Sequence, residues 1–72
     1  MSEIGVFPGL TIEENLQVGG QFIERAALRR RVAELYEYFP DLAARRGVLG
    51  GSLSGGQRKM LGIAKALASS PR

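Results

Sequence analysis

The most informative part of the chain is the run LSGGQRKMLGIAKALAS at residues 53–69. Ser54 and Gln57 stand three residues apart, which is the spacing of a capping box at the start of a helix. Gly55 and Gly56 place no side chain over the amides of the first turn, so another molecule can approach them closely. Because these amides lie at the positive end of the helix dipole, the run predicts a helix start that binds phosphate oxygens.

Ser54 can contribute a hydroxyl to such a site, and Gln57 a side-chain amide. The simpler interpretation is a well-capped helix that follows a flexible loop and binds nothing. The loop contains five glycines: Gly47, Gly50, Gly51, Gly55 and Gly56. We expect the helix to run from about Gly55 to Ser69 and to stop before Pro71.

Helical patterns also occupy the first half of the chain. Thr11 and Glu14 form a second capping-box pattern, which predicts a helix from Thr11 to about Val18 that ends at the glycine pair 19–20. A longer helix is expected over residues 24–39, closed by Pro40. Its apolar residues recur at helical spacing: Leu28, Val32, Leu35, Tyr36 and Phe39. Asp41 is expected to cap a short helical turn before Gly47.

The predicted fold class is therefore all-α, a small bundle of three to four helices with a glycine-rich loop before the last helix. The chain has 72 residues and contains neither cysteine nor histidine, which excludes disulfides and makes a typical zinc site unexpected. A chain this short buries only about 60% of its unfolded surface, so we expect a partner or a neighbouring domain to support it. No apolar run reaches the roughly 18 residues needed to span a bilayer, and a cytoplasmic location is expected.

Beyond these patterns, the sequence resembles a known family. Residues 53–57 resemble the signature motif of ABC ATPases, and the similarity continues to Pro71. Residues 6–16 (VFPGLTIEENL) are similar to the segment after the glutamine loop of that family. The arginine-rich helix and the run YFPDL at residues 38–42 look most like the ATPases of branched-chain amino acid importers.

The resemblance implies a division of the chain and a role for each part. Residues 1–10 would be a lead-in loop, residues 11–47 the helical subdomain, and residues 48–72 the glycine-rich loop, signature motif and signature helix. In this family two ATPase subunits sandwich ATP. Ser54, Gly55 and Gly56 would contact the γ-phosphate of ATP held by the second subunit, with Gln57 nearby. The magnesium ion would be held mainly by that opposing subunit.

The resemblance further implies transmembrane permease subunits as partners. Their coupling helices would meet residues around 6–16 and the glycine pair 19–20. The expected location is then the inner face of the cell membrane, and the expected full function is ATP-driven transport of branched-chain or similar amino acids.

Departures from the family pattern are equally informative. The chain has no Gly-x-x-x-x-Gly-Lys-[Ser/Thr] loop, no apolar strand ending in Asp-Glu and no switch histidine. We therefore assign no catalytic residue and no metal ligand. The chain is expected to be a fragment of an ATP-hydrolysing subunit and to be inactive alone.

Two alternative functions follow from the same residues. One is a stand-alone helical module that binds a protein and never meets nucleotide. The other is a segment of a nucleic-acid-associated ATPase with a related signature. The arginines at 25 and 29–31 are interspersed with glutamates, which favours a solvated helix face, and no nucleic acid is expected. Finally, if Leu61, Ile63 or Leu67 is exposed on the last helix, we expect self-association.

Overall fold

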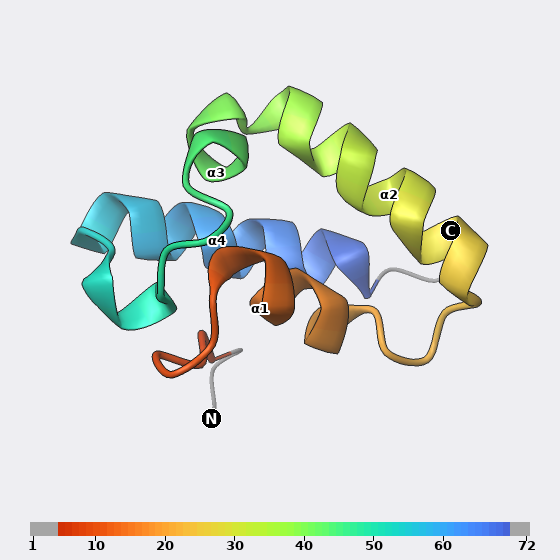
Figure 1. Ribbon diagram of the computed structural model, residues 1–72, viewed down its shortest axis with the longest axis horizontal. Coiled ribbons are helices and arrows are strands. Elements are labelled where there is room, and N and C mark those ends of the chain that lie inside the picture. The colour runs from red at the N-terminus through yellow and green to blue at the C-terminus, as the bar shows by residue number, and fades with distance from the viewer. Residues whose placement is uncertain (1–4, 70–72) are drawn as a thin grey trace.

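The computed structural model describes residues 5–69 and contains four α-helices (Figure 1). They are α1 (Ile12–Gly19), α2 (Arg25–Tyr38), α3 (Pro40–Ala44) and α4 (Gly55–Ala68), with a 3₁₀ turn, η1 (Gly50–Ser52), before α4. Within residues 5–69 there is no strand, only an isolated antiparallel bridge between Thr11 and Leu49. The predicted all-α fold class is confirmed.

The last helix, α4, is the centre of the bundle and contacts each of the other three helices. In Figure 1, α2 and α3 lie on one side of it and α1 lies against it on the other. The core between them is made of apolar side chains from all four helices and the loop before α4. Its buried members are Ile12, Leu16, Leu35, Leu42, Leu53, Leu61, Ala64 and Ala68. Full burial of each large aliphatic side chain contributes about 1.5–3 kcal/mol to stability.

The start of α1 is held by the capping box that the sequence predicts. The Thr11 hydroxyl accepts a hydrogen bond from the Glu14 amide at 3.1 Å, and the Glu14 carboxylate accepts one from the Thr11 amide at 2.9 Å. The helix ends at Gly19, with Gly20 as its C-cap. The longer helix, α2, begins after Glu24 and ends before Phe39. Both helices are confirmed to within a residue of their predicted ends.

The prediction that Asp41 caps the short third helix is wrong. This helix begins at Pro40, and its N-cap, Phe39, makes no side-chain hydrogen bond. Proline suits the first helical position because its φ angle is already helical and its missing N–H needs no partner there. Asp41 instead lies inside the first turn, where its carboxylate is 3.9 Å from the Arg45 guanidinium.

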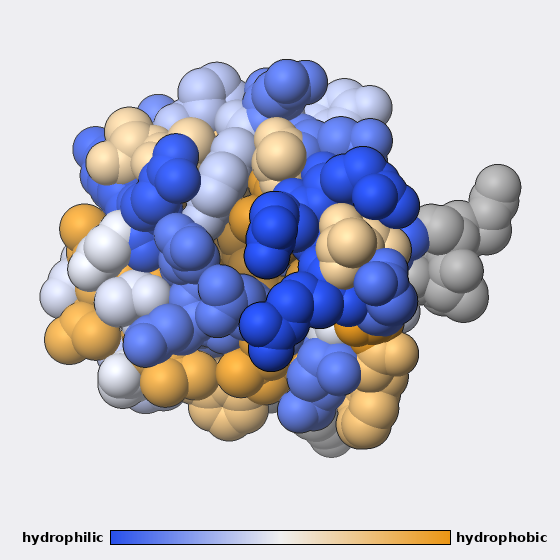
Figure 2. Space-filling view, turned by 45° about the vertical axis from the view of Figure 1, so that its right-hand side comes forward, coloured by the Kyte–Doolittle hydropathy of each residue, from blue (hydrophilic) through white to orange (hydrophobic). Residues whose placement is uncertain are grey.

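The prediction that Leu61, Ile63 or Leu67 is exposed on the last helix is correct for two of these residues and wrong for Leu61. Leu61 is completely buried, because it shares the inner face of α4 with Ala64 and Ala68. Ile63 and Leu67 are 51% and 47% exposed, as expected. Hydrophobic surface also gathers along the lower edge of the view in Figure 2. None of the helices within residues 5–69 has both the length and the apolar character to cross a bilayer.

Candidate functional site

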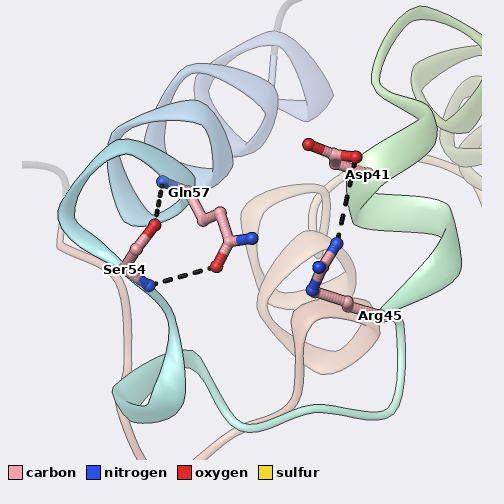
Figure 3. Close-up of polar contacts among 4 residues, drawn as sticks. All are labelled: Asp41, Arg45, Ser54 and Gln57. Atoms are coloured by element: carbon pink, nitrogen blue, oxygen red, sulfur yellow. Dashed lines mark hydrogen bonds and ion pairs between the residues drawn. The ribbon is translucent and has the colours of Figure 1, made fainter.

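The candidate phosphate site is the exposed start of α4, and its side chains form a closed capping box (Figure 3). Ser54 is the N-cap. Its hydroxyl accepts a hydrogen bond from the Gln57 amide at 3.1 Å, and its own amide donates to the Gln57 side-chain oxygen at 3.1 Å. The structure therefore brings Ser54, Gly55, Gly56 and Gln57 together at one helix end, with the first three exposed.

Several hydrogen-bond donors remain available at this end of the helix. Gly55 and Gly56 occupy the first two helical positions, where backbone amides have no partner inside the helix. The Ser54 hydroxyl accepts one bond in the box and keeps its own proton for donation. Within residues 5–69, the Gln57 side-chain amino group has no hydrogen-bond partner. An anion placed here would meet up to four donors.

The two glycines of the site are not required by the chain's own packing. Within residues 5–69, a Cβ atom built on Gly55 or on Gly56 meets nothing within 4 Å beyond its own helix backbone and chain neighbours. Neither glycine has a positive φ angle, so neither needs the conformational freedom of glycine. Glycine costs roughly 0.5–1 kcal/mol relative to alanine in a helix. This loss of helix stability is explained if another molecule has to come close to the backbone of Gly55 and Gly56.

The loop before the site is held by the packing of Leu53 and by the side chain of Arg58. Leu53 is 5% exposed and belongs to the core. The Arg58 guanidinium reaches back 3.4 Å to the carbonyl oxygens of Gly51 and Leu53, whereas Lys59 is exposed. The positive charge of Arg58 is thereby placed beside the loop, directly after residues 53–57.

A second feature is a groove of about 620 Å³ between α1 and α2. Apolar side chains of α2, among them Leu28, Val32 and Tyr36, line it, and Glu13 and Arg46 contribute charge. Hydrophobic surface is visible in the hollow between hydrophilic residues in Figure 2. These α2 residues were predicted to form an apolar face, and they are only partly buried, so the face is incompletely covered in this chain.

Tyr36 has an unusual environment inside this groove. Among residues 5–69 its buried hydroxyl has no hydrogen-bond partner, and the Arg46 guanidinium lies 4.7 Å from the centre of its ring. Burial, with a smaller contribution from Glu13, raises the pKa of the Tyr36 hydroxyl, and Arg46 opposes the shift. The Tyr36 hydroxyl is therefore an uncharged hydrogen-bond donor in the wall of the groove.

Two buried polar residues were not identified from the sequence as important. Asn15 is completely buried and Lys65 is 7% exposed. The Lys65 ammonium donates to the Gly5 carbonyl at 2.8 Å and lies 4.0 Å from the centre of the Phe7 ring. Burial lowers the pKa of Lys65. For Asn15 the available signal was its position, three residues after Ile12 and so on the same helix face as this core residue, where a polar side chain needs a structural reason.

Comparison with known proteins agrees with the resemblance. The profile of the ABC transporter family matches residues 1–72. The chain is 40% identical over 67 residues to the high-affinity branched-chain amino acid transport ATP-binding protein BraG of Pseudomonas aeruginosa, covering 93% of this chain and 29% of that protein. It is 39% identical over 62 residues to the probable branched-chain amino acid transport ATP-binding protein LivF of Archaeoglobus fulgidus, covering 86% of this chain and 26% of that protein.

Relatives named for other transported molecules also match. The methionine import ATP-binding protein MetN of Thermobifida fusca is 46% identical over 56 residues, covering 78% of this chain and 16% of that protein. The chain thus spans between 16% and 29% of the length of these three relatives. The family profile matches the chain over all 72 of the chain's residues, so the chain belongs to the ABC transporter family.

Proposed function

We propose that this chain supplies the signature half of an ATP site that is completed by a second ATPase subunit. Ser54, Gly55 and Gly56 would contact the γ-phosphate of ATP bound to that subunit, and Gln57 would lie beside them. The observation that carries the proposal is the exposed start of α4, where two glycines with free amides have no internal packing role. Close approach by a phosphate explains both their presence and their exposure.

The chemical contribution of this chain is charge stabilisation. Fixed amide and hydroxyl donors bind the negative charge on the phosphate oxygens without having to reorganise. This chain has no Gly-x-x-x-x-Gly-Lys-[Ser/Thr] loop to hold the remaining phosphates or the magnesium ion. Those roles fall to the opposing subunit, and this chain alone would not hydrolyse ATP.

The groove between α1 and α2 is the surface we propose for the permease. An amphipathic coupling helix would place apolar side chains against Leu28 and Val32. This interaction would place the chain at the inner face of the membrane, and the BraG and LivF relatives favour transport of branched-chain amino acids.

Photo-cross-linking tests the nucleotide contact directly. The chain is mixed with BraG subunits loaded with an ATP analogue that carries an azidoanilide group on its γ-phosphate. On illumination, the label should transfer to the peptide around residues 53–59 of this chain. Substitution Ser54→Arg should abolish the transfer, because a bulky cation replaces the hydroxyl at the contact.

The matched control is Glu24→Arg, which removes the side-chain cap from α2 and leaves the start of α4 intact. This variant should be labelled as well as the wild type. If Ser54→Arg is labelled as well as the wild type, Ser54 is not in the site. If the wild-type chain takes up no label while BraG is labelled, the trans contact is wrong and a helical protein-binding module becomes the better description.

A further inference from the structure

The buried side chain of Asn15 ties the segment of residues 7–11 to α1. Its oxygen accepts from the Phe7 amide at 2.8 Å. Its amino group lies within hydrogen-bond distance of three carbonyl oxygens, those of Phe7 at 3.1 Å, Leu10 at 3.2 Å and Thr11 at 2.9 Å. Since Asn15 is completely buried, water cannot replace these bonds. One side chain thus fixes the path of this segment.

The same segment supports the loop that leads into α4. The Gly50 amide donates to the Leu10 carbonyl at 2.8 Å, and the Gly51 amide donates to the Pro8 carbonyl at 3.1 Å. The fit is close: a Cβ atom on Gly50 would lie 2.9 Å from the Phe7 carbonyl oxygen and 3.3 Å from the Asn15 amino group. From Gly50 the connection to the candidate site is short. The Leu53 amide donates to the Gly50 carbonyl at 3.2 Å, and Ser54 follows directly.

We propose that Asn15 is a positioning residue for the candidate phosphate site. By fixing residues 7–11, it fixes Gly50 and Gly51, and through them the direction in which Ser54 and the α4 amides face a phosphate. Asn15 touches no nucleotide itself. The consequence for ATP rests on the proposed function, whereas the mechanical connection from Asn15 to Ser54 is independent of it.

Amide hydrogen exchange of the chain tests the mechanical connection. In the Asn15→Leu variant the Phe7 amide loses its partner, and the carbonyls of Phe7, Leu10 and Thr11 keep only a backbone donor. The Gly50 and Gly51 amides should then lose about tenfold or more protection relative to the amides of α2. The control is Leu35→Ala, a core substitution on α2 that should reduce protection throughout the bundle without this local excess. Unchanged relative protection at Gly50 and Gly51 in Asn15→Leu would overturn the proposal.

Two measurements cover the case in which Asn15→Leu does not fold. In the wild type, the Phe7, Gly50 and Gly51 amides should open together, with protection factors within about tenfold of one another. Faster exchange of Phe7 alone would refute the connection. Gly50→Ala perturbs the same junction from the opposite side and should show the same local loss of protection at Gly51.

The γ-azidoanilide label connects the geometry to function. Compared at equal folded fractions, Gly50→Ala and Asn15→Leu should be labelled about tenfold less than the wild type, whereas Leu35→Ala should match it. Full labelling of a folded Asn15→Leu chain would mean that Asn15 does not position the site. If the wild-type chain is not labelled, the proposed function fails, and the exchange experiment still decides whether Asn15 fixes the loop.

Discussion

The substitution Gly56→Ala should change stability and nucleotide contact in opposite directions. Apart from its own helix backbone and chain neighbours, the added methyl group meets no atom of the described residues within 4 Å, and the backbone φ angle is not positive. Alanine is therefore accommodated without strain, and it reduces the conformational entropy of the unfolded chain. We expect the free energy of unfolding to rise by about 0.5–1 kcal/mol.

The expected loss of contact follows from the same methyl group. If the Gly56 amide binds a phosphate oxygen, the methyl group holds the phosphate away and that bond is lost. A hydrogen bond to a charged group contributes about 1.5–3 kcal/mol, so γ-phosphate labelling should fall by about tenfold or more. The control is Gly62→Ala in the middle of α4, where an added Cβ atom likewise has no contact within 4 Å in the described part of the chain, apart from its own helix backbone and chain neighbours. It should stabilise the chain similarly and leave labelling unchanged.

Urea denaturation followed by circular dichroism measures the first effect. With a slope near 1 kcal/mol per molar urea for so small a chain, the midpoint should rise by about 0.5–1 M. Destabilisation by Gly56→Ala would show that the start of α4 is packed differently. A stabilised variant with full labelling would refute the idea that glycine is present here for the sake of the phosphate.

Three further predictions concern stability at high pH and self-association. Because burial lowers the pKa of Lys65, the unfolded state binds more protons than the folded state just below pH 10.5; stability should rise with pH in this window, and Lys65→Met should remove the rise. Because the pKa of Tyr36 is raised, the unfolded state ionises first; stability should fall as pH rises above 10.0, and Tyr36→Phe should remove the fall. Urea midpoints between about pH 8 and pH 11 measure both slopes, and a variant with the wild-type slope would contradict its assignment. The exposed Ile63 and Leu67 should cause the chain to self-associate, and Ile63→Glu with Leu67→Glu should make it monomeric in sedimentation equilibrium. Glutamate at Tyr38, which is more exposed and lies on α2, should leave the self-association unchanged, and a wild-type chain that is monomeric at all concentrations would disprove the idea.

Local patterns predicted the helices well because their ends are decided within a few residues. The boxes at Thr11 and Ser54 form as predicted, since each needs only residues three positions apart. The third helix was misplaced for a related reason. Asp41 is a good cap in isolation, but Pro40 is better suited to the first helical position than to the residue before the cap.

Tertiary contacts were less accessible from the sequence. Helical spacing places Leu61 on an apolar face, but only the packing of the bundle decides that it is inside while Ile63 is outside. Asn15 and Lys65 show the same limit. A polar residue on an apolar face signals a buried role, but its partners at Phe7 and Gly5 lie in a segment without regular structure. No periodic pattern identifies such partners. The residues of the candidate site were found because they are consecutive in the chain.

The two capping boxes of this chain differ in the charge of the residue that closes them, and this difference makes the two helix starts electrostatically unlike. In α1 the residue that closes the box is Glu14, and Glu13 stands beside it. That helix carries its own negative charge at its positive end and would repel a phosphate. In α4 the same position is held by the uncharged Gln57, and the first turn contains no acidic residue. The first turn of α4 therefore places no negative charge of its own beside a phosphate bound there.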